Sequence, residues 1–276
     1  MNQPGTERAT ATLAILAAWA IAALFLILPL ALVFQQAFAL GWSGVANALT
    51  DPDAESAIAL TLITAAISVP VNLVGGLAAA WCIAKFDFPG KTLLVSIIEL
   101  PFSISPVVSG LVWVLLFGSQ GWFAGELAAA HIQIIFALPG IVLATIFVTF
   151  PFVARTILPL MQEQGRDHEE AATMLGAGFF STLWHVVLPD IKWALLAGVL
   201  LTNARAMGEF GAVSVVSGHV SGLTETIPLQ IESLYDDYQS TAAFALSALL
   251  ACLGLITLVA KAVLEWHITR TRRIAA

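Results

Sequence analysis

The sequence predicts an all-helical integral membrane protein with about six transmembrane helices. Hydrophobic residues make up 59% of its 276 residues and charged residues only 11%, whereas a soluble domain carries about 25% charged residues. Several apolar stretches exceed the ~20 residues that a helix needs to cross a ~30 Å hydrocarbon layer. These stretches lack the alternation of a membrane β-strand, and a backbone in lipid must satisfy its own hydrogen bonds, so helices are expected.

Residues 1–276 are treated as one transmembrane domain. The first apolar stretch is much longer than the ~7–15-residue core of a secretory signal, so it is expected to remain as an uncleaved helix. The third stretch contains Pro101 and Pro106 among serines, which predicts either a simple kink or a gate that bends. The expected spans are 12–38, 57–84, 93–117, 133–158, 194–217 and 241–264.

The basic residues predict the orientation, because loops rich in Lys and Arg stay on the cytoplasmic side. Ten of the eleven Lys and Arg residues fall at the N-terminus, in alternate loops or in the C-terminal tail, and Arg205 lies within the fifth span. Both termini are therefore expected in the cytoplasm. The ten residues are Arg8, Lys85, Lys91, Arg155, Arg166, Lys192, Lys261, Arg270, Arg272 and Arg273.

The three opposite loops carry acids and no Lys or Arg. Such loops repel a free anion, so an anionic cargo would have to be delivered by another protein. The tendency of Lys and Arg to stay on the cytoplasmic side explains why these loops lack both residues, but it does not explain why they carry acids. The acids are Asp51, Asp53, Glu55, Glu126, Glu225, Glu232, Asp236 and Asp237.

An insert at residues 163–191 separates the fourth and fifth spans. It begins with acids and small residues and continues into an apolar run. Asp167 is expected to cap a short helix with acids near its positive end, and Gly176 is expected to end it. A second short helix is expected over 179–187, ending before Pro189 because the residue before proline disfavours helical backbone.

The second half of the insert is more apolar than a simple loop requires. Such an exposed surface indicates a site for a soluble partner. The apolar side chains expected on it are Phe179, Phe180, Leu183 and Trp184.

The spacing within the insert resembles the EAA loop of ABC-importer permeases. That motif is EAA-x3-G-x9-I-x-L-P, and only Val186 departs from it. The resemblance implies a type I ABC-importer permease bundle whose coupling helix docks on a nucleotide-binding subunit. It assigns ATPase coupling to Glu169, Glu170, Ala171, Ala172, Gly176, Leu188 and Pro189.

The chain itself is expected to hold no cofactor and to catalyse no reaction. Its Gly90-Lys91 pair lacks the preceding glycine of a G-x-x-x-x-G-K-[ST] phosphate loop. ATP and Mg²⁺ are therefore expected on a separate ATPase subunit.

Four polar residues within the spans are candidates for the translocation path. Arg205 and Glu209 are four residues apart on the expected fifth helix, and Arg205 is placed ~18 Å from the helix's inner end. Such charges are costly in lipid and mark functional sites, but an ion pair that only holds the packing is also open. Asn203 adds a polar group on the same helix, and Glu99 could pair with Arg205 across helices.

The run from Asn203 to Tyr238 resembles the sulfate/molybdate branch of ABC-importer permeases, and more closely its W-type sulfate/thiosulfate subunits. Its shared elements are NARAMGEFG from Asn203, then Ser217-Gly218-His219 and Ile227-Pro228-Leu229. The resemblance implies import of sulfate or thiosulfate across a bacterial inner membrane. The implied partners are a homologous T-type permease, two ATPase subunits and a periplasmic sulfate-binding protein, with membrane lipid and no nucleic acid.

Two alternatives remain open at this point. A molybdate or tungstate permease would carry an oxyanion of the same charge and shape, and it would usually be a homodimer. An ion-coupled secondary carrier would normally show two matching halves with broken helices, and no such repeat is found.

Overall fold

The computed structural model describes residues 4–275, with side chains from Thr10 to Trp266, and this part of the chain is helical without any strand. Five helices are long and apolar enough to cross a membrane, and a sixth span is possible if one bent pair is counted. The prediction of an all-α protein with about six spans is therefore confirmed.

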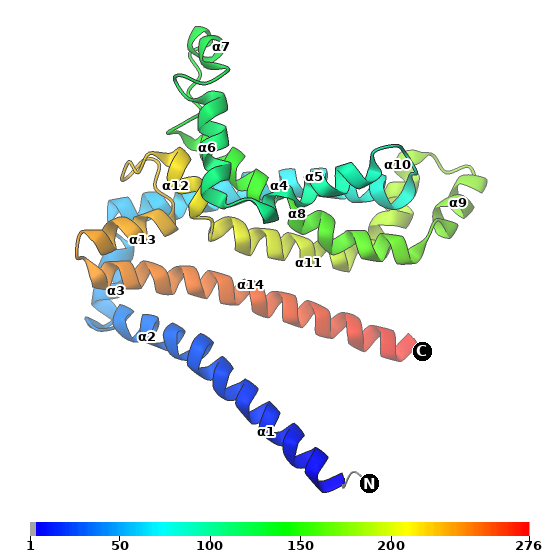
Figure 1. The fold of residues 1–276 in the computed structure, drawn as a ribbon, viewed down its shortest axis with the longest axis horizontal. Coiled ribbons are helices and arrows are strands. Elements are labelled where there is room, and N and C mark those ends of the chain that lie inside the picture. Colours follow the sequence, from blue (N-terminus) through cyan, green and yellow to red (C-terminus); the bar gives the residue numbers. More distant parts are fainter. Residues whose placement is uncertain (1–3, 276) are drawn as a thin grey trace.

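The first span, Thr10–Ala37, runs through α1 (Pro4–Ala22), a π-helical turn (Ala23–Ile27) and α2 (Leu28–Ala37). None of its most apolar stretch is buried by the rest of the chain. Only α2 packs against another long helix, α14 (Ser240–Ala275), whereas α1 extends away from the bundle (Figure 1). This span leaves its apolar surface for lipid or a partner.

The centre of the bundle is formed by α4 (Pro52–Lys85), α8 (Leu138–Gln164) and α11 (Leu188–Met207), which pack against one another. Asp51 caps α4 by accepting a 3.0 Å hydrogen bond from the backbone N–H of Asp53. This cap starts the helix five residues before the expected 57. The helix α8 extends to Gln164 instead of ending at 158. Arg155, which had been counted with the following loop, lies within this helix.

The third expected span is broken into α5 (Lys91–Ser103) and α6 (Pro106–Phe117), and the chain bends by 108° between them. Ser105 is extended, with ψ of 134°, because the ring of Pro106 disfavours helical backbone at the residue before it. Pro101 also removes one backbone donor from α5. The sequence therefore located this break, but it is much sharper than a kink.

The fifth expected span, 194–217, is wrong at both ends. One continuous helical stretch runs from Phe179 to Met207 and includes the second half of the insert. The chain then breaks at Gly208–Phe210, and the short helix α12 (Gly211–Ser217) packs against α6 and α8.

Shorter helices complete the end of the bundle opposite the insert: α3 (Gly41–Leu49), α7 (Ala124–Ala129) and α13 (Ile227–Asp236). In Figure 1, α3 and α13 lie at the far end of α4 from α9 (Asp167–Met174) and α10 (Phe179–Thr182), and α7 projects from the tip of α6. The acids that had been expected in the outer loops thus lie far from the insert.

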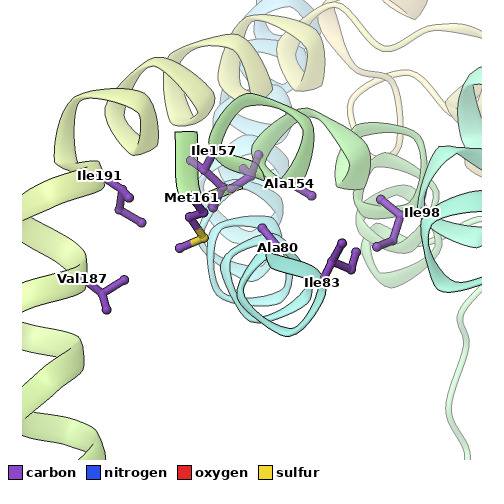
Figure 2. Close-up of a cluster of buried hydrophobic side chains, with 9 residues drawn as sticks. Ala80, Ile83, Ile98, Ala154, Ile157, Met161, Val187 and Ile191 are labelled. Carbon is purple, nitrogen blue, oxygen red and sulfur yellow. The ribbon is translucent and has the colours of Figure 1, made fainter. Parts of the chain in front are cut away.

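A buried apolar cluster joins α4, α5, α8 and α11 to the π-helical turn Leu183–Val187 at the end of the insert. Figure 2 shows its side chains converging from these helices. A rigid cluster at this point means that a displacement of the insert acts directly on packed helices. Its members are Ala80, Ile83, Ile98, Val153, Ala154, Ile157, Met161, Val187 and Ile191.

Candidate functional site

The insert begins with α9, which carries three acids in its first turn. These acids lie next to the positive end of the helix dipole, as expected. Arg166 rather than Asp167 occupies the capping position, and no side chain caps the helix. The prediction that Asp167 caps α9 is therefore wrong, because α9 starts at Asp167 itself.

The end of α9 confirms the expected role of Gly176 in stopping the helix. Gly176 has φ of +87°, a left-handed conformation that is costly for other residues. Its N–H bonds to the carbonyl of Thr173 at 2.9 Å, and the N–H of Ala177 bonds to the carbonyl of Ala172 at 3.0 Å. These two bonds form a Schellman motif, which reverses the chain toward α10.

The second helix of the insert does not end before Pro189, contrary to expectation. A π-helical turn, Leu183–Val187, joins α10 to α11 without a break. The backbone N–H of Leu188 bonds to the carbonyl of Leu183, five residues back. Such a turn is wider than an α-helical one, and it accommodates a proline whose ring would clash with the carbonyl four residues earlier.

The insert exposes a row of large apolar side chains. Met174 and Leu175, at the end of α9, are 88% and 90% exposed. This surface is larger than expected, because α9 contributes to it as well as α10, while Leu183 is half-buried. The exposed side chains are Met174, Leu175, Phe179, Phe180 and Trp184.

The motif residues divide between the surface of the insert and its interior. Glu170, Ala171, Gly176 and Pro189 are exposed, whereas Ala172 and Leu188 are half-buried. Glu169, the acid before the motif, points inward, and its Oε1 lies 2.8 Å from Lys85 Nζ at the end of α4. In the sequence, Lys85 was informative only about orientation, and nothing near it indicated this contact.

Arg205 and Glu209 form an ion pair with a separation of 2.6 Å between Nη1 and Oε2. They do not share one helix, since α11 ends at Met207 and Glu209 lies in the break before α12. Glu209 is buried, and its Oε1 accepts a 3.0 Å hydrogen bond from the backbone N–H of Ala212. The pair therefore joins the end of α11 to the start of α12.

Arg205 lies in the last turn of α11 rather than midway along it, because the helix extends back to Phe179. A cation at this position interacts favourably with the negative end of the helix dipole. Asn203 is half-buried two residues before Arg205, and its Nδ2 lies 3.9 Å from Met207 Sδ, one turn later on the helix.

Glu99 does not pair with Arg205, so that hypothesis is wrong. Glu99 is exposed on α5 and forms no ion pair among the side chains from Thr10 to Trp266. It lines a cleft of about 240 Å³ together with Arg155 of α8. The guanidinium of Arg155 lies 5.2 Å from the ring centroid of Phe102.

This arrangement defines a class of protein: a helical membrane permease with an apolar insert presented at one end of its bundle. Residues 71–273 match the family described as binding-protein-dependent transport system inner membrane component. The chain belongs to this family, whose members are permease subunits and not enzymes.

Proteins named sulfate transport system permease protein are among the similar sequences. CysW of Synechococcus elongatus is 54% identical over 91% of this chain and 88% of its own length. CysW of Escherichia coli K12 is 48% identical over 92% of this chain and 88% of its own length. CysT of the same E. coli strain is 35% identical over 85% of each chain.

A solved structure has the same fold. A chain in the crystal structure of a bacterial alginate ABC transporter, in complex with an alginate pentasaccharide-bound periplasmic protein, superimposes with a TM-score of 0.77. The match covers 95% of this chain and 96% of that one at 17% identity. It confirms the fold of an ABC transporter permease.

Proposed function

We propose that this chain is the transmembrane subunit of an ATP-driven importer of sulfate and thiosulfate. The observation that carries the proposal is its identity of 54% and 48%, over about nine-tenths of its length, to permeases named for sulfate transport. The similarity to CysT is much lower, which favours the W-type role over the T-type role.

The proposed assembly is a heterodimer of this chain with a T-type permease, two ATPase subunits that bind ATP and Mg²⁺, and a periplasmic sulfate-binding protein. The exposed apolar row of the insert supports an ATPase partner, because a surface of this kind is expected to be covered. The first span supports a permease partner, since its apolar face packs against little of its own chain.

The proposed orientation places both termini and the insert in the cytoplasm of a bacterial cell and α3, α7 and α13 on the outer side. Closure of the ATPase subunits on ATP would then pull paired inserts together and turn the bundles outward. The acids near α3 and α13 would not concentrate an anion, which agrees with delivery by a binding protein.

Arg205, Glu209 and Asn203 are proposed to lie beside the path of the anion. The side chain of Arg205 is one-third exposed although its partner is buried. This exposure would leave guanidinium N–H groups able to contact a passing oxyanion. Glu99 is also retained as a path candidate, now beside Arg155 and not beside Arg205.

The test is uptake of labelled sulfate by liposomes that carry the two permeases and the ATPase, with the binding protein added outside. Uptake is expected to require ATP inside the vesicle together with binding protein outside it, and to be competed by thiosulfate. Uptake of labelled molybdate without uptake of labelled sulfate would favour the molybdate alternative. Uptake driven by an ion gradient without ATP would instead indicate a secondary carrier.

A further inference from the structure

The last turn of α4 contacts both halves of the insert. Lys85 reaches Glu169 on α9, and the indole of Trp81 stacks on the ring of Phe179 on α10. The two rings have centroids 5.1 Å apart and are inclined by only 5°. Because Trp81 and Lys85 are four residues apart, they lie on one face of α4.

Lys85 is a buried cation with two partners from the chain around the insert. Its side chain is 6% exposed, and that of Glu169 is 19% exposed. Lys85 Nζ also donates a hydrogen bond to the backbone carbonyl of Gly165, between α8 and α9. A buried ammonium is costly unless such partners surround it, so this contact is expected to hold its geometry.

Gly165 has a backbone conformation that directs its carbonyl to Lys85. Its φ is +65° and its ψ is −149°, a region that is essentially confined to glycine. No atom lies within 4 Å of a Cβ built at this position, so the glycine is required by the backbone and not by crowding. Lys85 of α4 therefore contacts both Gly165 at the end of α8 and Glu169 on α9.

The other contacts of α9 with the bundle are weaker. His168 Nδ1 lies 2.9 Å from Asp190 Oδ2, but the histidine is largely exposed. Arg166 lies 4.0 Å from Asp87, which is also exposed. Exposed pairs of this kind contribute little to stability, and α9 contributes no buried residue of its own.

The space between the two contact points is open. A cleft of about 670 Å³ lies between α4 and the insert, lined by Trp81, Lys85, Glu169, Thr173 and Phe179 among others. Within the insert, α9 is therefore attached to α4 through Lys85 and not along a packed face, which lets α9 tilt while remaining connected. The other end of the insert is fixed, because Val187 and Ile191 pack in the buried cluster.

We propose that Lys85 is the positioning residue that transmits movement of the insert to α4 and, through the buried cluster below it, to the helix bundle. This inference rests on the proposed function, in which the insert receives force from an ATPase. Trp81 is the second contact of the same joint. Loss of the joint would leave ATP hydrolysis running without a matching movement of the bundle.

The test uses the full complex in liposomes and measures sulfate taken up per ATP hydrolysed. Lys85→Met is expected to lower this ratio about tenfold, within the usual range of coupling between sites, while the complex still assembles and hydrolyses ATP. Glu169→Gln, which preserves the shape of the side chain, is also expected to lower the sulfate taken up per ATP. It replaces Lys85→Met as the test if the Lys85→Met complex cannot be produced.

Lys91→Met is the matched control, since among the described side chains Lys91 pairs with Asp87 alone, at 3.2 Å, and that aspartate is exposed. Its transport ratio should equal that of the unmodified complex. If Lys85→Met and Glu169→Gln keep the unmodified ratio, or if transport and hydrolysis fall in proportion, the inference is overturned.

A second measurement tests the contact between Lys85 and the insert without depending on which substrate is transported. Hydrogen exchange of the purified full-length chain in detergent is expected to show residues 166–178 exchanging about tenfold faster in Lys85→Met than in Lys91→Met, because local opening follows local stability. Unchanged exchange would overturn the joint even if sulfate is transported. Absence of sulfate uptake by the unmodified complex would instead count against the proposed function alone.

Discussion

Arg205 and Glu209 form an ion pair that joins two consecutive helices, α11 and α12, across the break at Gly208–Phe210. Their 2.6 Å ion pair spans the break between α11 and α12 while Glu209 also accepts the N–H of Ala212. The pair can therefore serve the packing of the break, the path of the anion, or both.

Arg205→Ala is expected to abolish uptake while the assembled complex still hydrolyses ATP. It would also leave the carboxylate of Glu209 buried without its cation. Because Arg205 is one-third exposed, we expect a loss of about 2 kcal/mol, below the ~3–5 kcal/mol found for fully buried pairs. Thermal unfolding in detergent and uptake in liposomes measure the two effects separately.

The double variant Arg205→Ala/Glu209→Gln separates the two roles of Arg205. Glutamine removes the unpaired charge and keeps the carbonyl that accepts from Ala212, so stability is expected to recover. If Arg205 also contacts the anion, uptake stays low in this stable variant. Recovery of uptake together with stability would assign the pair to packing alone.

Gly176→Ala tests the turn between the two helices of the insert. An alanine at φ of +87° is disfavoured by about 1 kcal/mol or slightly more, so α9 is expected to reorient and ATP-driven uptake to fall several-fold. Gly178→Ala is the matched control, because Gly178 has φ of −78° and open space around it. Equal uptake by the two variants would show that the Schellman turn is not needed.

Leu175→Glu tests the exposed apolar row of the insert. Leu175 is 90% exposed, so a charge there should leave the permease folded but disfavour burial against an apolar groove. We expect the amount of ATPase that copurifies with the permease to fall about tenfold, since an apolar contact at an interface centre contributes ~1–2 kcal/mol. Thr92→Glu adds the same charge at an exposed position on α5 and should copurify normally; a loss there too would make the effect nonspecific.

Local signals in the sequence located the insert and one of its turns. The motif spacing placed the insert between two spans, and Gly176 was identified as the end of α9 because left-handed backbone strongly favours glycine. Pro106 likewise marked the break between α5 and α6. Each of these features depends on residues close together in the chain.

The errors concern features that depend on distant residues or on competing local signals. Lys85 and Glu169 are 84 positions apart, and neither has a neighbour that reveals the other. The π-helical turn keeps Pro189 within a helix, although proline usually marks an end. The apolar run after Gly211 resembles a continued span, but α11 ends at Met207 and α12 packs as a separate short helix.

A second buried polar contact, between Asn72 of α4 and Thr149 of α8, gives a final prediction about the core. Asn72 Nδ2 donates to Thr149 Oγ1 at 2.6 Å, and both residues are fully buried. Thr149→Val would keep the shape but remove the acceptor, so unfolding in detergent should become easier by about 1–3 kcal/mol. Thr145→Val is the control, because the hydroxyl of Thr145 is equally buried but donates only to Ile141 of its own helix. A similar small loss in both variants would mean that the contact between α4 and α8 adds nothing beyond apolar packing.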